Sequence, residues 1–456
     1  MNGAQDTIIA LATAQGVGAI AVIRISGDDA ITLTDRHFKP RSKTPLTEAA
    51  SHSIHLGDLY DKKRIVDEVL VSVFRAPRSY TGENVVEIAC HGSIYIQQQI
   101  LNLFVASNTC RVAQPGEFTF RAYKNGKMKL SEAEAVADLI ASESAAEHRI
   151  AIEQMRGGFA TSLSNIRAQL LHFASMIELE LDFSGEDVDF ADYSSLKELL
   201  KTLKENIKQL LDSFALGNVI KQGIPIAIIG APNAGKSTLL NSLLNEERAL
   251  VSDEAGTTRD TVEDFLTLNG IRFRLIDTAG IRNTSNQVEK MGIERSIERA
   301  QNAHLIVYVI DASDPNTEAL TLEPEILTPE RTLIVLNKSD LSKNIDIANL
   351  SRYECIEISA KEGQNIESLK ERISTRVLEG TSSGDATILT NSRHFQSLQS
   401  ALNEIYTLEE ELENRASQDL LAIPLRSIIH HLGEITGVVT NDDILGSIFS
   451  SFCIGK

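Results

Sequence analysis

The sequence is poor in cysteine, has fewer basic than acidic residues and contains no long uncharged apolar run. Its four scattered cysteines are too few for a disulfide framework, and none forms the CxxC pair of a zinc site. No stretch of about eighteen apolar residues lacks a charge and no signal-peptide pattern is present, so we expect a cytoplasmic protein without membrane spans. The 44 basic and 63 acidic residues give a formal charge of −19, which opposes general attraction to nucleic acid or anionic lipid.

The sequence does have an ordinary globular composition, with 456 residues of which 42% are hydrophobic, enough for roughly three domains. Residues 1 to about 120 carry β-branched runs broken by glycine and proline, which indicates a compact α+β domain. From Leu130 the pattern becomes helical, and Ser131 with Glu134 is a capping-box signature. From about residue 222, short apolar runs alternate with helical segments, as is typical of parallel strands covered on both faces.

The helical pattern returns near Arg393, after the linker-like segment TSSGD, so the α/β unit interrupts a helical domain that both flanks build. We therefore expect a multidomain protein that combines an α+β, an all-α and an α/β part. The expected boundaries are 1–120 for the N-terminal domain, 121–221 and 381–456 for the two parts of the helical domain, and 222–380 for the inserted α/β domain.

A phosphate-binding loop is predicted at residues 230–237, where GAPNAGKS fits GxxxxGK[ST] between a buried-looking strand and a helix. In such a turn the backbone N–H groups and the helix N-terminus hold phosphate. Lys236 meets the outer phosphates and the Ser237 hydroxyl takes a magnesium position. A chance glycine turn is the alternative, and the ordered motifs that follow argue against it.

Further motifs follow at strand ends and in the loops between them. Asp277 in DTAG can reach magnesium through water, the Gly280 N–H can meet the γ-phosphate, and a threonine in residues 256–260 offers a hydroxyl to the same metal. Asp340 in NKSD can accept both the ring N–H and the amino group of guanine, which adenine cannot satisfy. We therefore expect GTP rather than ATP, with residues 359–361 behind Asp340.

In this order and with these strands, the motifs resemble those of the Ras-like P-loop GTPase superfamily. Ras-like enzymes orient the attacking water with a glutamine directly after DTAG. This chain has Ile281 there, so another polar group must act. Glu289 is the nearest downstream candidate, and a solvent-facing helical glutamate is the alternative. Arg259 and Arg282 are candidates for neutralising charge in the transition state, with ordinary surface or switch-loop arginines as the alternative.

The flanks of the α/β unit decide between classes of GTPase. The tail FCIGK, residues 79–92 (SYTGENVVEIACHG) and residues 115–127 (PGEFTFRAYKNGK) closely resemble the tRNA uridine-modification GTPases of the MnmE (TrmE) family, over essentially the whole chain. The resemblance implies an N-terminal folate-binding domain that dimerises, a discontinuous helical domain and an inserted Ras-like G domain. It also implies a homodimer that acts with an FAD-dependent partner, MnmG (GidA). Together they add a carboxymethylaminomethyl or aminomethyl group to carbon 5 of the wobble uridine (position 34) of certain tRNAs.

The resemblance further implies a folate ligand of the 5,10-methylenetetrahydrofolate or 5-formyltetrahydrofolate type, which supplies the one-carbon unit. Family positions place it at Arg24, Glu87, Lys127 and Lys456. Cations suit the glutamate carboxylates of a folate, and a carboxylate suits the amidine-like edge of its pterin. Without the family, Arg24 and Glu87 are strand-face charges and Lys127 belongs to a solvated loop.

The family also fills the gap left at Ile281. In similar GTPases a potassium ion, bound when two G domains meet, supplies the missing positive charge, and Glu289 orients the water through a bridging water. The resemblance therefore implies that potassium, and not sodium, accelerates turnover. An oxygen-rich cage suits a hard cation. The metal positions are Asn233, Ser252, Glu254 and Thr257 for potassium, and Ser237 and Thr258 for magnesium. The expected GTP-binding residues are Asn233, Ala234, Gly235, Lys236, Ser237, Thr238, Ser252, Asp253, Glu254, Ala255, Gly256, Thr257, Thr258, Asp277, Thr278, Ala279, Gly280, Asn337, Lys338, Asp340, Ser359, Ala360 and Lys361.

Cys453 has two interpretations. A lone cysteine near the end of a chain is usually a small inert hydrophobe, whereas the resemblance implies a residue that modification requires. Gly455 and Lys456 beside it allow close backbone approach to a ligand and provide a cation. The expected catalytic residues are Glu289, Cys453, Arg259 and Arg282.

The best local basic patch for tRNA consists of Arg121, Lys124, Lys127 and Lys129, with Tyr123 interleaved. Solvated loop charge is the alternative for most of these, and the partner is expected to supply much of the phosphate binding. Residues 178–192 hold seven carboxylates and no cation. Their spacing matches no calcium loop, which favours a helix-breaking solvated loop over a metal site.

Two rival classes share the GTP motifs. A GTP-dependent RNA or ribosome-assembly switch without modification chemistry usually appends a basic RNA-binding domain, whereas this chain appends an acidic helical body. A dynamin-like membrane GTPase needs an apolar or basic lipid-facing segment, which the sequence lacks. The flanks therefore favour the modification GTPase.

Overall fold

The computed structural model describes residues 6–106, 109–182, 193–245, 264–276, 300–314, 326–341, 350–379, 388–440, 442–450 and 452–456. The chain forms two compact units, and neither is continuous in sequence. The first unit comprises Met1–Ile140, Glu153–Lys204 and Ser397–Lys456, and the second comprises Ala141–Ile152 and Glu205–Gln396. The domain boundaries expected at 120, 221 and 380 remain predictions.

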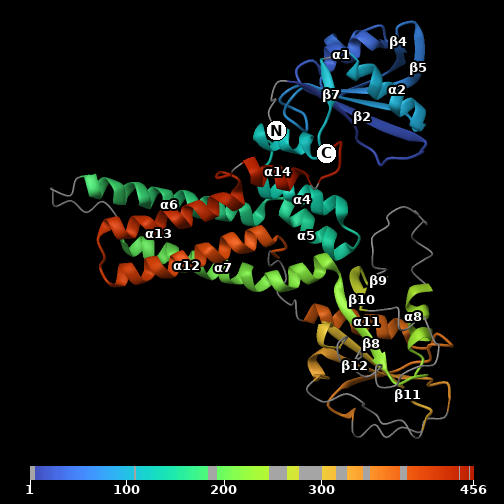
Figure 1. The fold of residues 1–456 in the computed structure, drawn as a ribbon, viewed down its shortest axis with the longest axis vertical. Helices are drawn as coiled ribbons and strands as arrows, with labels where there is room; N and C mark the ends of the chain where they lie inside the picture. The colour runs from blue at the N-terminus through green and yellow to red at the C-terminus, as the bar shows by residue number, and fades with distance from the viewer. Residues whose placement is uncertain are drawn as a thin grey trace. The chain divides into compact units, whose positions relative to one another are not determined.

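A seven-stranded sheet forms the N-terminal part of the first unit, with strand order β3-β4-β5-β6-β2-β1-β7 (Figure 1). Its neighbouring strands are antiparallel except for the parallel pair of β1 and β7. Val69, Val71 and Val73 alternate with more exposed residues along β5, and helices α1 and α2 pack on the buried face. The elements are β1 Thr7–Leu11, β2 Ile20–Ser26, α1 Ala30–His37, β3 Phe38–Pro40, β4 Ser53–Asp61, β5 Arg64–Phe74, β6 Val85–His91, α2 Ile94–Val105 and β7 Cys110–Val112.

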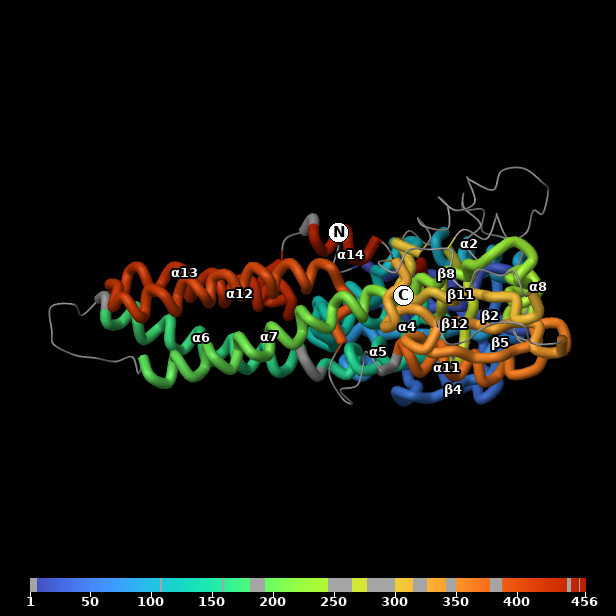
Figure 2. Tube along the Cα trace, turned by 90° about the horizontal axis from the view of Figure 1, so that it is seen from below, coloured from blue at the N-terminus to red at the C-terminus, as the bar shows by residue number. Residues whose placement is uncertain are grey.

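Long helices follow the sheet, and α6, α7, α12 and α13 lie side by side in both views (Figures 1 and 2). Leu196, Leu200 and Leu203 on α7 are fully buried, which confirms that its apolar stripe packs between helices. None of the helices in the described ranges is long and apolar enough to cross a membrane. The helices are α3 Glu117–Lys124, α4 Leu130–Ala141, α5 Ala145–Met155, α6 Gly158–Asp182, α7 Tyr193–Gln222, α12 Ser392–Glu413, α13 Gln418–Thr436 and α14 Asp442–Ser450.

Helix α4 begins two residues earlier than its capping signature indicated, because a cap at Ser131 would make Glu132 the first helical residue. Its first residue is Leu130, so Ser131 lies inside the first turn, where its buried hydroxyl has no hydrogen-bond partner in the part of the chain that the structure describes. The capping carboxylate is Glu132, which accepts a hydrogen bond from the backbone N–H of Lys129 at 2.9 Å. The carboxylate half of a capping box is thus made two residues before the predicted pair of Ser131 and Glu134.

The second unit is built on a six-stranded sheet of order β13-β12-β11-β8-β10-β9. Strands β8, β11 and β12 are almost completely buried between two apolar layers, which confirms the expected parallel strands covered on both faces. Only the β9–β10 pairing is antiparallel among the described strands of this sheet. Its elements are β8 Ile224–Gly230, α8 Lys236–Asn245, β9 Asp264–Leu268, β10 Ile271–Leu275, β11 Leu305–Asp311, β12 Thr332–Asn337, β13 Glu354–Glu357 and α11 Ile366–Glu379.

The tip of the β9–β10 hairpin packs on a segment from far earlier in the chain. The backbone N–H of Ala146, in the first turn of α5, donates to the Gly270 carbonyl at 3.0 Å. Arg272 pairs with Glu143 at 2.8 Å and stacks on the ring of Phe265, with its guanidinium carbon 3.7 Å from the ring centroid. Residues 141–152 therefore belong to the second unit because they complete its edge hairpin.

Candidate functional site

The loop between β8 and α8 has the backbone conformation that its glycines predict. Gly230 and Gly235 have φ angles of 148° and 95°, where residues with side chains are rarely found. A Cβ on Gly230 would lie 2.1 Å from the Val309 carbonyl oxygen, and one on Gly235 would lie 2.1 Å from Nδ2 of Asn337. Both glycines are thus required by space as well as by conformation, and the loop is packed closely against β11 and the end of β12.

Lys236 and Ser237 are the first two residues of helix α8, so they lie at its positive N-terminal end. The Lys236 ammonium lies over the loop and donates to the carbonyls of Gly230 and Ala231 at 2.9 and 2.7 Å. Asn233 in the same loop has a φ of 64°, a left-handed conformation that asparagine tolerates. The arrangement places a cation and backbone donors around one small loop, which suits an anionic phosphate group.

Asn337 joins three segments of the site. Its amide Nδ2 donates to the Ala234 carbonyl at 2.8 Å, and its Oδ1 accepts the backbone N–H of Ala360 at 3.0 Å. The side chain is almost fully buried, so these bonds hold the phosphate loop, the end of β12 and residues 359–361 together. Next to it, the Ser359 hydroxyl donates to Asp340 at 2.6 Å. Ser359 therefore orients the carboxylate that we expect to read guanine.

The remaining predicted residues near this site differ in exposure. Thr238 is exposed on α8, and Lys361 is 82% exposed and lies 3.6 Å from Glu362. Lys338 pairs with Asp311 at 2.5 Å. Sequence reasoning missed Asp311, although its position at the end of an apolar strand, like that of Asn337, was a usable signal.

The predicted switch and catalytic residues of the G domain lie outside the described residues. They are Ser252, Asp253, Glu254, Ala255, Gly256, Thr257, Thr258, Arg259, Asp277, Thr278, Ala279, Gly280, Arg282 and Glu289. Their assignments stay predictions.

A second group of predicted residues meets on one face of the N-terminal sheet. Arg24 on β2 and Glu87 on β6 are directly opposite in the antiparallel register, and Nε and Nη2 of Arg24 lie 2.9 and 2.8 Å from Oε1 of Glu87. Nη1 of Arg24 also donates to the Gly455 carbonyl at 3.4 Å. Burial lowers the pKa of the Lys456 ammonium, and the nearby Arg24 charge lowers it further. Arg24, Glu87 and Lys456 are therefore neighbours, as the folate prediction requires.

Two aromatic rings that sequence reasoning missed flank this group. The Arg24 guanidinium carbon is 5.4 Å from the centroid of the Tyr80 ring and 5.7 Å from that of Phe118. Both rings belong to the two segments quoted for the family resemblance, and their place in those segments was the available signal. The site thus combines a carboxylate, two cations and flat apolar surfaces.

The C-terminal segment reaches this face through close backbone contacts. Gly455 has a φ of 102°, and a Cβ there would lie 2.2 Å from the Leu11 carbonyl oxygen of β1. The Cys453 carbonyl accepts from the backbone N–H of Gly116 at 3.4 Å. Lys127, by contrast, lies on another loop and donates to the Pro77 carbonyl at 3.0 Å.

Cys453 differs from the other three cysteines, all of which are in the described part of the chain. It is exposed, whereas Cys90 and Cys110 are buried. Burial raises the pKa of the Cys90 thiol to about 11 and that of Cys110 to about 12, so both are un-ionised and inert near neutral pH. Among these thiols, Cys453 is the one most accessible to a substrate.

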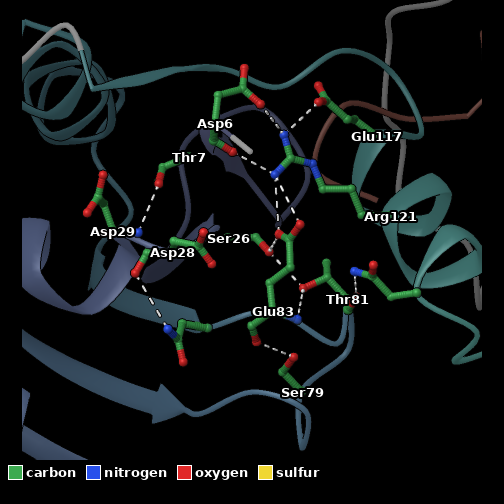
Figure 3. Close-up of polar contacts among 12 residues, drawn as sticks. Asp6, Thr7, Ser26, Asp28, Asp29, Ser79, Thr81, Glu83, Glu117 and Arg121 are labelled. Carbon is green, nitrogen blue, oxygen red and sulfur yellow. Dashed lines mark hydrogen bonds and ion pairs between the residues drawn. The ribbon is translucent and has the colours of Figure 1, made fainter. Parts of the chain in front are cut away.

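The interpretation of Arg121 as part of a basic patch for tRNA is wrong. Its side chain is 5% exposed and pairs with Asp6, Glu83 and Glu117 at 2.7, 3.2 and 3.0 Å (Figure 3). Burial opposes the charge of Arg121, but Glu83 and Glu117 raise its pKa, so the guanidinium stays ionised inside the protein. The Lys129 ammonium donates to the Thr161 hydroxyl on α6, so a second member of the predicted patch is engaged within the protein.

The acidic segment also departs from its prediction where it is described. Glu178 and Glu180 continue helix α6 rather than entering a loop. Glu178 pairs with Arg426 at 2.6 Å, and the buried Glu180 accepts from the Tyr193 hydroxyl at 2.8 Å. Residues 183–192 lie outside the described ranges.

Two family models match this chain, one described as MnmE helical domain over residues 130–453 and one as GTP-binding protein TrmE N-terminus over residues 7–127. A tRNA modification GTPase MnmE from Christiangramia forsetii is 51% identical over 471 residues, which covers 99% of each chain. A protein of the same name from Bacteroides fragilis is 50% identical, and the alignment covers 99% of this chain and the whole length of that protein. Among solved structures, the FeoB G-domain from Methanococcus jannaschii aligns with 33% of this chain and 96% of its own at 28% identity and a TM-score of 0.24.

Proposed function

The chain belongs to the MnmE family and is a GTPase that acts in tRNA modification, and from this we propose the specific reaction that it serves. With an FAD-dependent partner, MnmG (GidA), it adds a carboxymethylaminomethyl or aminomethyl group to carbon 5 of the uridine at tRNA position 34. The one-carbon unit comes from a 5,10-methylenetetrahydrofolate or 5-formyltetrahydrofolate bound on the N-terminal sheet. The protein acts as a homodimer.

The guanine nucleotide is held at two ends in this proposal. The phosphate loop with Lys236 binds the phosphates, and Asp340, backed by Ser359 at 2.6 Å, pairs with the guanine edge. The buried Asn337 amide ties these ends together, so neither can shift without the other. Adenine would leave the Asp340 carboxylate without its two donors, which is costly in a partly buried site.

Two cations complete the G-domain proposal. Ser237, at the first turn of α8, and Thr258 would hold magnesium, and the left-handed Asn233 with Ser252, Glu254 and Thr257 would hold potassium. All of these side chains offer oxygen donors, which hard cations prefer. When bound, the ions would neutralise charge on the outer phosphates. Glu289 would orient the hydrolytic water, with Arg259 and Arg282 as further candidates for charge neutralisation.

The folate proposal depends on the convergence of Arg24, Glu87 and Lys456, and this observation carries it. Glu87 uses Oε1 for Arg24, and its Oε2 has no hydrogen-bond partner among the described residues. That oxygen can accept from the amidine-like edge of a pterin, while Tyr80 and Phe118 offer flat apolar surfaces. Lys456 and Lys127 supply cations for the glutamate carboxylates of the cofactor.

Cys453 acts in modification and not in GTP hydrolysis in this account. It is exposed next to Gly455 and Lys456, which border the folate site, and it belongs to the first unit, whereas the phosphate loop belongs to the second. A Cys453→Ser variant should therefore abolish wobble-uridine modification and leave the rate of GTP hydrolysis unchanged.

The test uses cells that lack the protein, complemented with wild type, Cys453→Ser or the matched control Cys355→Ser, whose thiol is partly buried in β13. Nucleosides from their tRNA are analysed by mass spectrometry, and GTPase rates are measured on the purified chains. Loss of the modified uridine with Cys453→Ser alone supports the proposal. Retained modification would refute a chemical role for Cys453. Unchanged nucleosides in the knockout would favour a GTP-dependent assembly switch.

A further inference from the structure

A carboxylate that belongs to none of the GTP-binding motifs lies beside the predicted guanine pocket. Asp311 ends β11 and is in register with Asn337, which ends the neighbouring parallel strand β12. Its Oδ2 accepts from the Lys338 ammonium at 2.5 Å, and its Oδ1 accepts from the Ser313 N–H and hydroxyl at 3.0 and 2.6 Å. Both oxygens of the carboxylate are therefore engaged, and one of them fixes the lysine of the NKSD motif.

The backbone at Lys338 is arranged for this contact. Its φ is 64°, a left-handed conformation that is uncommon for a residue with a long side chain. The backbone N–H of Leu341 donates to the Lys338 carbonyl at 3.0 Å, which closes a turn over the NKSD motif. The turn places Lys338 between Asn337, which is tied to the phosphate loop, and Asp340, which we expect to bind guanine.

The Lys338 ammonium thus pairs with Asp311, while Asp340, the carboxylate of its own motif, has a different partner. Asp340 accepts from Ser359, and no cation of the described residues lies within ion-pair distance of it. The side chains of Asp311 and Lys338 are 17% and 34% exposed, so their pair is less screened by water and salt than a surface pair. Burial disfavours the charge on Asp311, but hydrogen bonds from Lys338 and Ser313 outweigh it and lower the pKa of Asp311, which keeps the carboxylate ionised.

We propose that Asp311 is a positioning residue for guanine nucleotide binding: it holds the Lys338 ammonium away from Asp340 and leaves that carboxylate free for the base. The proposal rests on the GTP-binding part of the function proposed above. Without Asp311, the ammonium competes for Asp340, and each nucleotide must displace it before guanine can pair. Anchoring also orders a four-carbon stem before the nucleotide arrives, so less conformational entropy is lost on binding. The stem then offers a fixed apolar surface at the side of the pocket.

An Asp311→Asn variant tests this role, because asparagine keeps the shape of the side chain and removes its charge. We expect the Kd for a fluorescent GDP analogue to rise by about ten-fold, the effect typical of losing one hydrogen bond between charged groups. The KM for GTP should rise in parallel, with kcat changed by less than about two-fold. In a Lys338→Met background, the same Asp311→Asn change should leave the Kd unaltered, because the competing ammonium is already absent.

The matched control is Glu367→Gln, which removes the carboxylate of another lysine pair, Glu367 with Lys370 at 2.7 Å on α11. It should leave the Kd unchanged. An unchanged Kd in Asp311→Asn, or equal weakening in the native and Lys338→Met backgrounds, would overturn the proposal. If Asp311→Asn does not fold, as judged by its thermal unfolding curve, Ser313→Ala replaces it and should raise the Kd by about two-fold, with no rise counting against the proposal. A wild-type chain that binds no guanine nucleotide would overturn the proposed function as well.

Discussion

Two groups of charged residues in the first unit differ in whether contacts within the protein satisfy all of their charges. The arginine cluster, made of Asp6, Glu83, Arg111, Glu117 and Arg121, is satisfied by the protein itself. Figure 3 shows the contacts of Arg121 with Asp6, Glu83 and Glu117. The strand pair of Arg24 and Glu87 is not, because the described residues use only one oxygen of Glu87 and its side chain is 27% exposed. Charged groups whose ion pairs are all made within the protein hold segments of the chain together. A carboxylate with one unused oxygen beside aromatic rings is available to a ligand.

The largest effect is expected from breaking the arginine cluster. Replacing Arg121 by alanine leaves the buried carboxylate of Glu117 with fewer donors, and removal of one partner from a buried ion pair typically costs about 3–5 kcal/mol. We expect the first unit to lose this amount of unfolding free energy in urea titrations. GTP hydrolysis by the second unit should persist at urea concentrations below the unfolding midpoint of the first unit. An Arg121→Ala chain as stable as wild type would show that the cluster does not stabilise the fold.

An intermediate effect is expected from the strand pair, and it should appear in binding. Glu87→Gln removes the charge that we expect to face the pterin, so the Kd for 5-formyltetrahydrofolate should rise by about ten- to a hundred-fold in calorimetric titrations. Its unfolding free energy should change by less than about 1 kcal/mol, because the pair is partly solvated.

The control for that titration is Glu68→Gln, which breaks the exposed pair of Glu68 with Arg41 on the same sheet. It should alter neither folate affinity nor stability. Equal folate affinity in the Glu87→Gln and wild-type chains would remove Glu87 from the site and would leave the strand pair as a structural feature.

The smallest effect concerns acid stability. Burial opposes the charge of Glu117, but hydrogen bonds from Arg111, the Gln114 N–H and Arg121 outweigh it and lower the pKa of Glu117 below its ordinary 4.5. A carboxyl whose pKa is lower in the folded state contributes stability that is complete above pH 4.5 and is lost as the pH falls below that value. The unfolding midpoint of the first unit should therefore drop between about pH 5 and pH 3. Glu117→Gln should flatten this dependence, and an unchanged slope would contradict the assignment.

Local patterns account for what the sequence could predict. The phosphate loop follows from the glycines at 230 and 235, whose conformation and spacing are set within eight residues. The strand alternation around Val71 and the apolar stripe of α7 are likewise properties of short windows. The resulting α+β, all-α and α/β parts are present as expected.

Contacts between distant segments account for what could not be predicted. Arg121 was assigned to a basic patch because two of its partners, Asp6 and Glu83, lie 115 and 38 residues away. Only Glu117, four residues before it, was a local signal. The strand-end position of Asp311 was a usable signal, but its contact with Lys338, which lies 27 residues later just after the next strand, was not. Arg24 and Glu87 could be paired in advance only through the family, because strand order cannot be derived from residue pattern alone.

The contact between the β9–β10 hairpin and residues 141–152 has a consequence for biosynthesis. The ribosome releases this segment before all of α6 and α7, long before Gly270 is made. The Ala146 N–H must therefore stay hydrated in the nascent chain until the Gly270 carbonyl arrives. Co-translational folding of the second unit cannot proceed as one emerging stretch of polypeptide. A recombinant fragment that begins at β8 would lack the strip of chain that closes its hairpin.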